Sequence, residues 1–148
     1  MEKWKPLDWV PCKSFTLDKV EHIIQFENDK LELTLSSSDK TNLYNITFQD
    51  VFSYRVTMEH FLCSQYTENE FKLVCPHRDA CIYQVRNSLY IEELNQKGMY
   101  DLHSELRVLH FILLTDVHNV DVIVHEKSKI IINNALTKDT HTIFCDIL

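Results

Sequence analysis

The chain has 148 residues, 45% of them hydrophobic and 25% charged, which predicts a folded domain with a sizeable core and excludes intrinsic disorder. Fifteen lysines and arginines stand against 22 aspartates and glutamates, a formal net charge of −7. This charge argues against a nucleic-acid partner and favours a basic protein as the partner. A charge that only keeps the protein soluble is the alternative explanation. Gly98 is the only glycine, which excludes the glycine-rich loops that hold phosphates and dinucleotides.

No repeat, low-complexity tract or linker interrupts the sequence, which predicts a single domain over residues 1–148. The N-terminal sequence has no apolar signal segment, and the longest uncharged apolar run, 108–115, is far shorter than the roughly 20 residues that span a membrane. The five cysteines are odd in number and irregularly spaced, a pattern more typical of reduced thiols than of a disulfide framework. We therefore expect a soluble, non-secreted protein of the cytoplasm without membrane contact.

The N-terminal part of the chain predicts an arm followed by a β-hairpin. Residues 1–13 contain both tryptophans and two prolines and are interpreted as an irregular arm pinned by its aromatic side chains. Apolar residues then alternate over 20–26 and over 31–35, on either side of a polar turn, which is the pattern of a hairpin. A helix over 17–24 is the competing prediction, because its apolar residues also fit a period of 3.6.

The middle of the chain predicts further short strands. Alternating apolar residues indicate strands at 44–48 and 52–56. Residues 68–70 are interpreted as an exposed loop before a short strand at 71–74, which a proline ends soon after. Residues 82–85 predict another strand.

A helix is expected next, over residues 89–97. Asn87 or Ser88 can cap its first turn, since the side chains of both residue types accept hydrogen bonds from free backbone N–H groups. Gly98 follows the last turn and supplies the stop that glycine commonly provides there.

The C-terminal part predicts the centre of the fold. Residues 106–114 are apolar on both alternating faces, which indicates a central strand covered on each side, and a turn at 116–119 leads into a second strand with valines at alternating positions. The tail segments 130–132 and 142–148 fit either an edge strand or packing against the sheet. The predicted fold class is α+β, a mainly antiparallel β-sheet that could be a partly closed barrel, with one or two short helices.

The sequence from Cys75 to Cys81 gathers two thiols, an imidazole and a carboxylate within seven residues. Cys75, His77 and Cys81 are therefore the candidate metal ligands. Structural zinc sites have four ligands in closely spaced pairs, however, and no second pair follows in the sequence. We predict no metal and no cofactor, and interpret this segment as a solvated loop between half-buried cysteines. No residues show a nucleophile, base and orienting group together, so no catalytic residue is predicted.

Histidines near the last hairpin are the other chemical candidates. Asp121 and His125 alternate with the valines of the second strand, which allows an acid–base or metal cluster but is more typical of the wet face of a strand. His110 alternates with apolar residues, so we expect it to be buried and hydrogen-bonded.

Arg55 and Glu59 lie at the end of a strand rich in aromatic residues. Arginine and tyrosine are enriched at binding hot spots, although an ion pair or a cation–π contact would explain the arginine as well. With Glu92 and Glu93, these two residues are the candidate binding residues on the surface.

The stretch 46–59 resembles small uncharacterised bacterial proteins, some of which are similar to immunity proteins of polymorphic toxin systems. The resemblance extends through 85–91 to the strand 109–114 and the Asp121-Val122-Ile123 pairing. It implies a non-catalytic binding protein without a catalytic site.

Three functions follow as hypotheses. The first is an acidic, non-catalytic protein-binding module, an immunity-type inhibitor that binds a basic toxin. The second is a small enzyme or metal-binding protein that uses Cys75, His77 and Cys81. The third is a small-molecule-binding β-barrel, for which the dense aromatic residues are the only indication.

Overall fold

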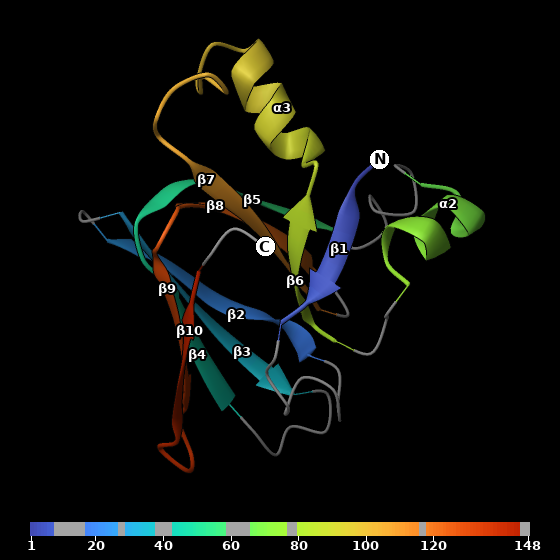
Figure 1. The fold of residues 1–148 in the computed structure, drawn as a ribbon. Coiled ribbons are helices and arrows are strands. Elements are labelled where there is room, and N and C mark those ends of the chain that lie inside the picture. Colours follow the sequence, from blue (N-terminus) through green and yellow to red (C-terminus); the bar gives the residue numbers. More distant parts are fainter. Residues whose placement is uncertain are drawn as a thin grey trace.

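The structure is a computed structural model, and it describes residues 1–7, 17–26, 29–37, 43–58, 66–76, 80–115 and 118–145, with only the backbone described for 17–26. Its strands form two antiparallel sheets of five strands each (Figure 1). Among the described residues, no strand pairing joins one sheet to the other. The fold is therefore α+β with mainly antiparallel sheets, as predicted, and the two sheets do not close into one barrel.

Sheet A has the strand order β1-β6-β7-β8-β5. In chain order its strands are β1 (Lys3–Pro6), β5 (Val51–Met58), β6 (Ile82–Arg86), β7 (Val108–Leu114) and β8 (His118–His125). Sheet B has the order β10-β9-β4-β3-β2. Its strands are β2 (Leu17–Phe26), β3 (Lys30–Ser37), β4 (Leu43–Phe48), β9 (Lys129–Asn134) and β10 (Thr140–Phe144).

The main core lies between the two sheets, because alternate residues of each strand point inward. Leu33 and Ile46 from sheet B and Phe111 and Val122 from sheet A are almost completely buried there. The other face of sheet A is covered in part by two helices, α2 (Glu68–Val74) and α3 (Leu89–Gln96). Figure 1 shows α2 beside β1 and α3 projecting from the end of sheet A.

Most predicted strands are confirmed. β2 pairs with β3 as the expected hairpin, so the competing helix over 17–24 was wrong. β7 is the middle strand of sheet A and is buried on both faces, as its continuous apolar sequence indicated. The helix at 89–96 is also confirmed, with Ser88 as its N-cap and Gly98 at a φ of 72° after its end.

Two local predictions were wrong. Residues 68–74 form the helix α2 rather than a loop and a strand, because Thr67 and Glu70 make a capping box in which each side chain accepts from the other's backbone N–H. Residues 3–6 form strand β1, paired with β6, rather than an irregular arm. Trp4 on this strand is buried against Phe71 of α2, with ring centroids 5.4 Å apart.

The start of the chain is held by the carboxylate of Glu2, which is 6% exposed. It accepts a hydrogen bond of 2.9 Å from the backbone N–H of Leu89, the first residue of α3. The hydroxyl of Tyr66 donates to the same carboxylate. Glu2 therefore joins the N-terminus of α3 to the segment that precedes α2, where a negative charge also suits the helix dipole.

Among the described residues, no helix combines the length and the apolar character that a membrane crossing requires.

Candidate functional site

The site is centred on Asp121, whose side chain lies on the face of sheet A that carries the helices. The register of the sheet places Arg55 of β5 directly opposite Asp121 of β8. Paired residues of an antiparallel sheet share a face, and the Arg55 guanidinium donates from Nε to Oδ2 of Asp121 at 3.1 Å. Asp121 is 5% exposed, so this ion pair is largely shielded from water.

His110 reaches the same carboxylate from β7. Its Nε2 lies 2.7 Å from Oδ1 of Asp121, and its Nδ1 lies 2.7 Å from the hydroxyl oxygen of Ser88. That hydroxyl oxygen also accepts the backbone N–H of Ile91 at 3.0 Å, which is the N-cap bond of α3. The network therefore links β5, β8 and β7 to the first turn of α3.

The hydrogen bonds define the proton positions that satisfy this network. The carboxylate of Asp121 can only accept, so Nε2 of His110 donates to it. In the neutral imidazole, Nδ1 is then the acceptor for the hydroxyl proton of Ser88. Each polar side chain is satisfied, as the low dielectric of the interior requires.

The ionised form of Asp121 is stabilised by its neighbours. Burial by itself raises the pKa of this carboxyl, but the hydrogen bond from His110, the charge that His110 carries when protonated, and the Arg55 guanidinium outweigh it and leave the pKa below its ordinary value. Asp121 is therefore charged at neutral pH.

Tyr90 and Glu93 of α3 complete the contacts of Arg55. The guanidinium carbon lies 4.0 Å from the centroid of the Tyr90 ring, and its NH1 donates to Glu93 at 3.3 Å. Lys97 also donates to Glu93 at 2.7 Å, and that bond is the main reason why the pKa of Glu93 is lowered. The Tyr90 hydroxyl lies 2.7 Å from that of Ser53, and burial raises the pKa of Tyr90.

Ser88, His110 and Asp121 stand in the order of a serine–histidine–aspartate relay. Such a relay could withdraw the hydroxyl proton, but the hydroxyl here also caps α3 and Asp121 is neutralised by Arg55. Ser88 is 8% exposed and His110 is 3% exposed. What the geometry supports directly is a fixed attachment of α3 to sheet A.

The prediction that Asp121 lies on the wet face of its strand was wrong, because α3 covers that face. His125, by contrast, is only partly buried, beside the ring of Phe52. The expectation that His110 is buried and hydrogen-bonded is confirmed. The network was missed because its members come from four elements, and only strand register brings them together.

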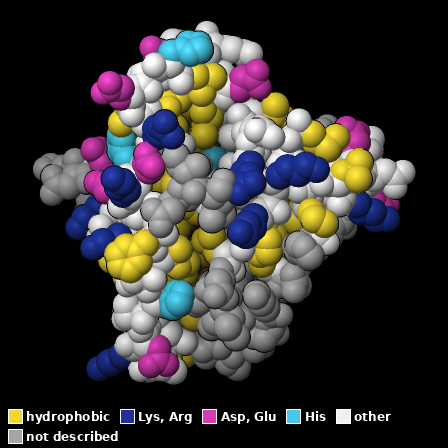
Figure 2. Space-filling view, in the orientation of Figure 1, with side chains coloured by type: hydrophobic (Ala, Val, Ile, Leu, Met, Phe, Trp, Pro, Cys, Tyr) yellow, Lys and Arg dark blue, Asp and Glu magenta, His cyan; other side chains and the backbone are white. Residues whose placement is uncertain are grey.

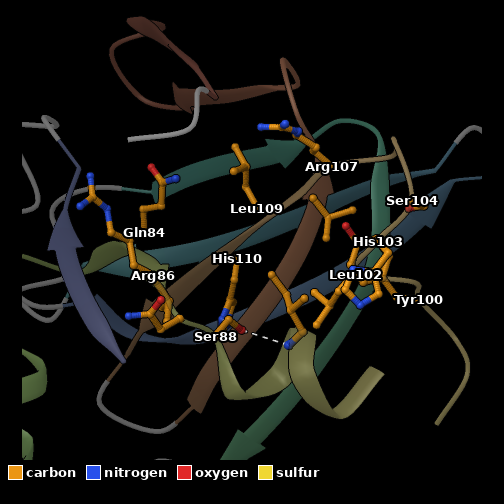
Figure 3. A pocket seen from close by; sticks show the side chains of 14 residues that line it. Gln84, Arg86, Ser88, Tyr100, Leu102, His103, Ser104, Arg107, Leu109 and His110 are labelled. Carbon is orange, nitrogen blue, oxygen red and sulfur yellow. Dashed lines mark hydrogen bonds between the residues drawn. The ribbon is translucent and has the colours of Figure 1, made fainter. Parts of the chain in front are cut away.

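A pocket of about 640 Å³ opens beside this network, and Ser88 and His110 line one wall of it (Figure 3). The segment 98–107, which leads from α3 to β7, forms another part of the wall through Tyr100, Leu102 and His103. The pocket lies at the end of sheet A, where β6 ends and β7 begins.

The outer surface of α3 and of segment 98–107 carries exposed apolar and acidic side chains, beside the exposed cations Lys97 and Arg107. Leu89, Met99, Leu102 and Leu106 are each at least 43% exposed. The acidic residues of the same stretch that are largely exposed are Glu92, Asp101 and Glu105. We call this set of seven residues the α3 surface. Figure 2 shows hydrophobic side chains at this end of the molecule with acidic side chains near them.

The predicted binding residues separate in the structure. Arg55 and Glu93 belong to the network, whereas Glu92 is exposed on the α3 surface. Glu59 lies outside the described residues.

Of the three metal ligands considered in the Cys75–Cys81 segment, the structure describes Cys75 and Cys81. Cys81 is disulfide-bonded, which removes its thiolate as a ligand and corrects the prediction of reduced thiols for this residue. Cys75 carries a thiol and is buried, and His77 lies outside the described residues. Among the described residues, no three histidine, cysteine or acidic side chains form a group that could hold a metal ion.

Comparisons with protein-family models, with curated proteins and with solved structures found no match.

Proposed function

We propose that this chain is a non-catalytic protein-binding module that binds a basic protein through the α3 surface, in the manner of an immunity-type inhibitor. The observation that carries the proposal is the combination of exposed leucine and methionine side chains with exposed carboxylates on one projecting element. Apolar side chains surrounded by polar groups are typical of protein interaction sites.

Charge complementarity selects the kind of partner. Glu92, Asp101 and Glu105 make no ion pair within the described part of the chain. Lysine or arginine side chains of a partner could pair with them, which favours rapid association and rejects acidic competitors. The formal net charge of −7 acts in the same direction.

The buried network supports binding rather than catalysis in this proposal. Arg55, His110 and Ser88 connect α3 to three strands of sheet A. A surface fixed in this way loses little conformational freedom when a partner binds, so less of the interaction energy is spent on ordering it.

The experiment is native mass spectrometry of the untagged protein from its own host, followed by titration of the partner with purified variants. Glu92→Lys/Glu105→Lys reverses two charges on the α3 surface. Glu32→Lys/Glu68→Lys is the matched control, since Glu68 occupies the first turn of α2 as Glu92 does in α3.

A complex with one basic protein is expected, at least tenfold weaker for the α3 variant and unchanged for the control. An acidic partner, a homodimer, a bare chain, or a complex that both variants bind equally would contradict the proposal.

The compartment is decided separately. A cytoplasmic location was predicted from the number and spacing of the cysteines, but the disulfide at Cys81 is of a kind that is rare in reducing compartments. Thiol labelling of intact cells after acid quenching distinguishes a reducing compartment, such as the cytoplasm, from an oxidising one. Labelling of Cys81 would support the cytoplasm, and protection until reduction would oppose it.

A further inference from the structure

The pocket beside α3 has a charge opposite to that of the whole protein. Arg86, Arg107 and His103 line it, and none of the described aspartates and glutamates does. Neither arginine forms an ion pair with any of the described residues. Both arginines are exposed.

Strand register places the two arginines close together. Val85 of β6 pairs with His110 of β7, so the next residues, Arg86 and Leu109, lie opposite each other. Arg107 precedes Leu109 by two positions, which puts it on the same face and diagonal to Arg86, at roughly 7–8 Å between backbone positions. Figure 3 shows Arg86 and Arg107 at two ends of the pocket lining, with Gln84 and Leu109 between them.

The rest of the pocket is suited to an apolar group and to hydrogen bonds. Ile91, Leu102 and Val108 contribute apolar wall, while Gln84 and Ser104 contribute polar atoms. A volume of about 640 Å³ lies within the range of pockets that hold small organic molecules, which are mostly apolar with a few placed polar groups.

Glu126 is an acidic residue that lies beside Arg107 without lining the pocket. The backbone N–H of Glu126 donates to the carbonyl of Arg107 at 2.9 Å, so Glu126 is its neighbour on the next strand. Their side chains make no ion pair. Lys3 faces Arg86 in the register of β1 and β6 and adds a further positive charge on the same face.

We propose that this pocket binds a small organic anion, with a phosphate or carboxylate group between Arg86 and Arg107 and an apolar body against Leu109. Guanidinium groups bind such oxyanions by paired, charge-assisted hydrogen bonds. Neither arginine belongs to the α3 surface, so anion binding and the binding of a protein partner can each fail without the other.

The test is isothermal titration at low ionic strength with three probes: phenyl phosphate, benzoate and inorganic phosphate. Phenyl phosphate or benzoate is expected to bind with a Kd on the order of 1 mM or tighter. Whichever of phenyl phosphate and benzoate binds more tightly shows whether the site prefers a phosphate or a carboxylate group. Arg86→Gln and Arg107→Gln are each expected to weaken that binding at least tenfold.

Two variants serve as controls. Lys72→Gln on α2 removes one exposed cation far from the pocket lining and is expected to leave binding unchanged. Glu126→Gln removes the nearest competing carboxylate and is expected to strengthen binding severalfold.

No binding of either organic probe, or binding that neither arginine variant weakens, would overturn the proposal. Inorganic phosphate binding as well as phenyl phosphate would overturn its apolar part. Unchanged thermal midpoints confirm that the variants are folded.

Discussion

His110 and Asp121 lie on neighbouring strands, and Nε2 of His110 is 2.7 Å from Oδ1 of Asp121 although both residues are almost fully buried. Arg55 contacts the other oxygen of the same carboxylate from a third strand. One aspartate thus connects three strands and, through Ser88, the first turn of α3. A buried polar centre of this kind is costly to disturb, because removing one member leaves the others without a partner.

Asp121→Asn is expected to lower the free energy of unfolding by about 3 kcal/mol, since it leaves the partly buried guanidinium of Arg55 without its carboxylate. Urea denaturation monitored by circular dichroism measures the change. Glu93→Gln is the comparison, because it removes an exposed ion pair of the same arginine and is expected to cost less than about 1 kcal/mol. Equal effects of the two substitutions would show that the buried contact has no special weight.

Stability is expected to fall in acid because the pKa of Asp121 is lowered in the folded protein. The unfolded chain then takes up the proton at a higher pH than the folded one, so the stabilisation is complete above the ordinary pKa and is lost as pH falls through the folded pKa. Urea midpoints between neutral pH and pH 3 measure the loss. Asp121→Asn should flatten this dependence, and an unchanged slope in the variant would assign it to other carboxyl groups.

Ser88→Ala is expected to destabilise the protein more than Thr67→Ala, although both remove a helix N-cap. Loss of a cap costs about 1 kcal/mol in either helix. Ser88 also satisfies the buried Nδ1 of His110, whereas the cap of α2 is exposed. Loss of the Ser88 hydroxyl therefore adds roughly 1–3 kcal/mol, because Nδ1 becomes an unsatisfied buried group. The backbone N–H groups of Ile91 and Glu70 donate to the cap side chains of Ser88 and Thr67, respectively. Amide hydrogen exchange at Ile91 and at Glu70 therefore locates the effect of each substitution.

The strands could be predicted from the sequence because alternation of apolar residues reports directly on a half-buried strand. The 31–35 and 44–48 segments show this pattern and form the strands β3 and β4, as expected. α2 was missed although its signal was present, since Thr67 and Glu70 have the spacing of a capping box. The apolar residues Phe71, Leu73 and Val74 at the end of this helix look like a short strand when the cap is overlooked.

The site could be predicted only in part. Arg55 stood out as a cation among the aromatic residues of its own strand, but its cation–π contact is with Tyr90 of α3. Asp121 was assigned to solvent because alternation shows which residues share a face but not what covers the face. That information depends on where α3 packs, and α3 lies between β6 and β7 in the chain and over β8 in space.

Reduction is expected to release two further thiols, because Cys81 is disulfide-bonded. Thiol titration of the denatured protein before and after reduction counts them. Cys81→Ser should abolish the difference, while Cys75→Ser should keep it, since Cys75 carries a thiol. An equal count before and after reduction would show that the bond is absent and would restore Cys81 as a candidate ligand.

Glu2→Gln is expected to loosen the junction between the N-terminus and both helices. The substitution keeps the shape of the side chain but removes the negative charge that Leu89 N–H and the Tyr66 hydroxyl donate to. It also removes a favourable charge at the N-terminus of α3, so a loss of about 1–3 kcal/mol is expected. Urea denaturation gives the total, and faster hydrogen exchange at Leu89 locates it. Glu70→Gln, at the exposed cap of α2, is the control and should cost less than about 1 kcal/mol. If the two variants are equally stable, the buried carboxylate of Glu2 contributes no more than an exposed one.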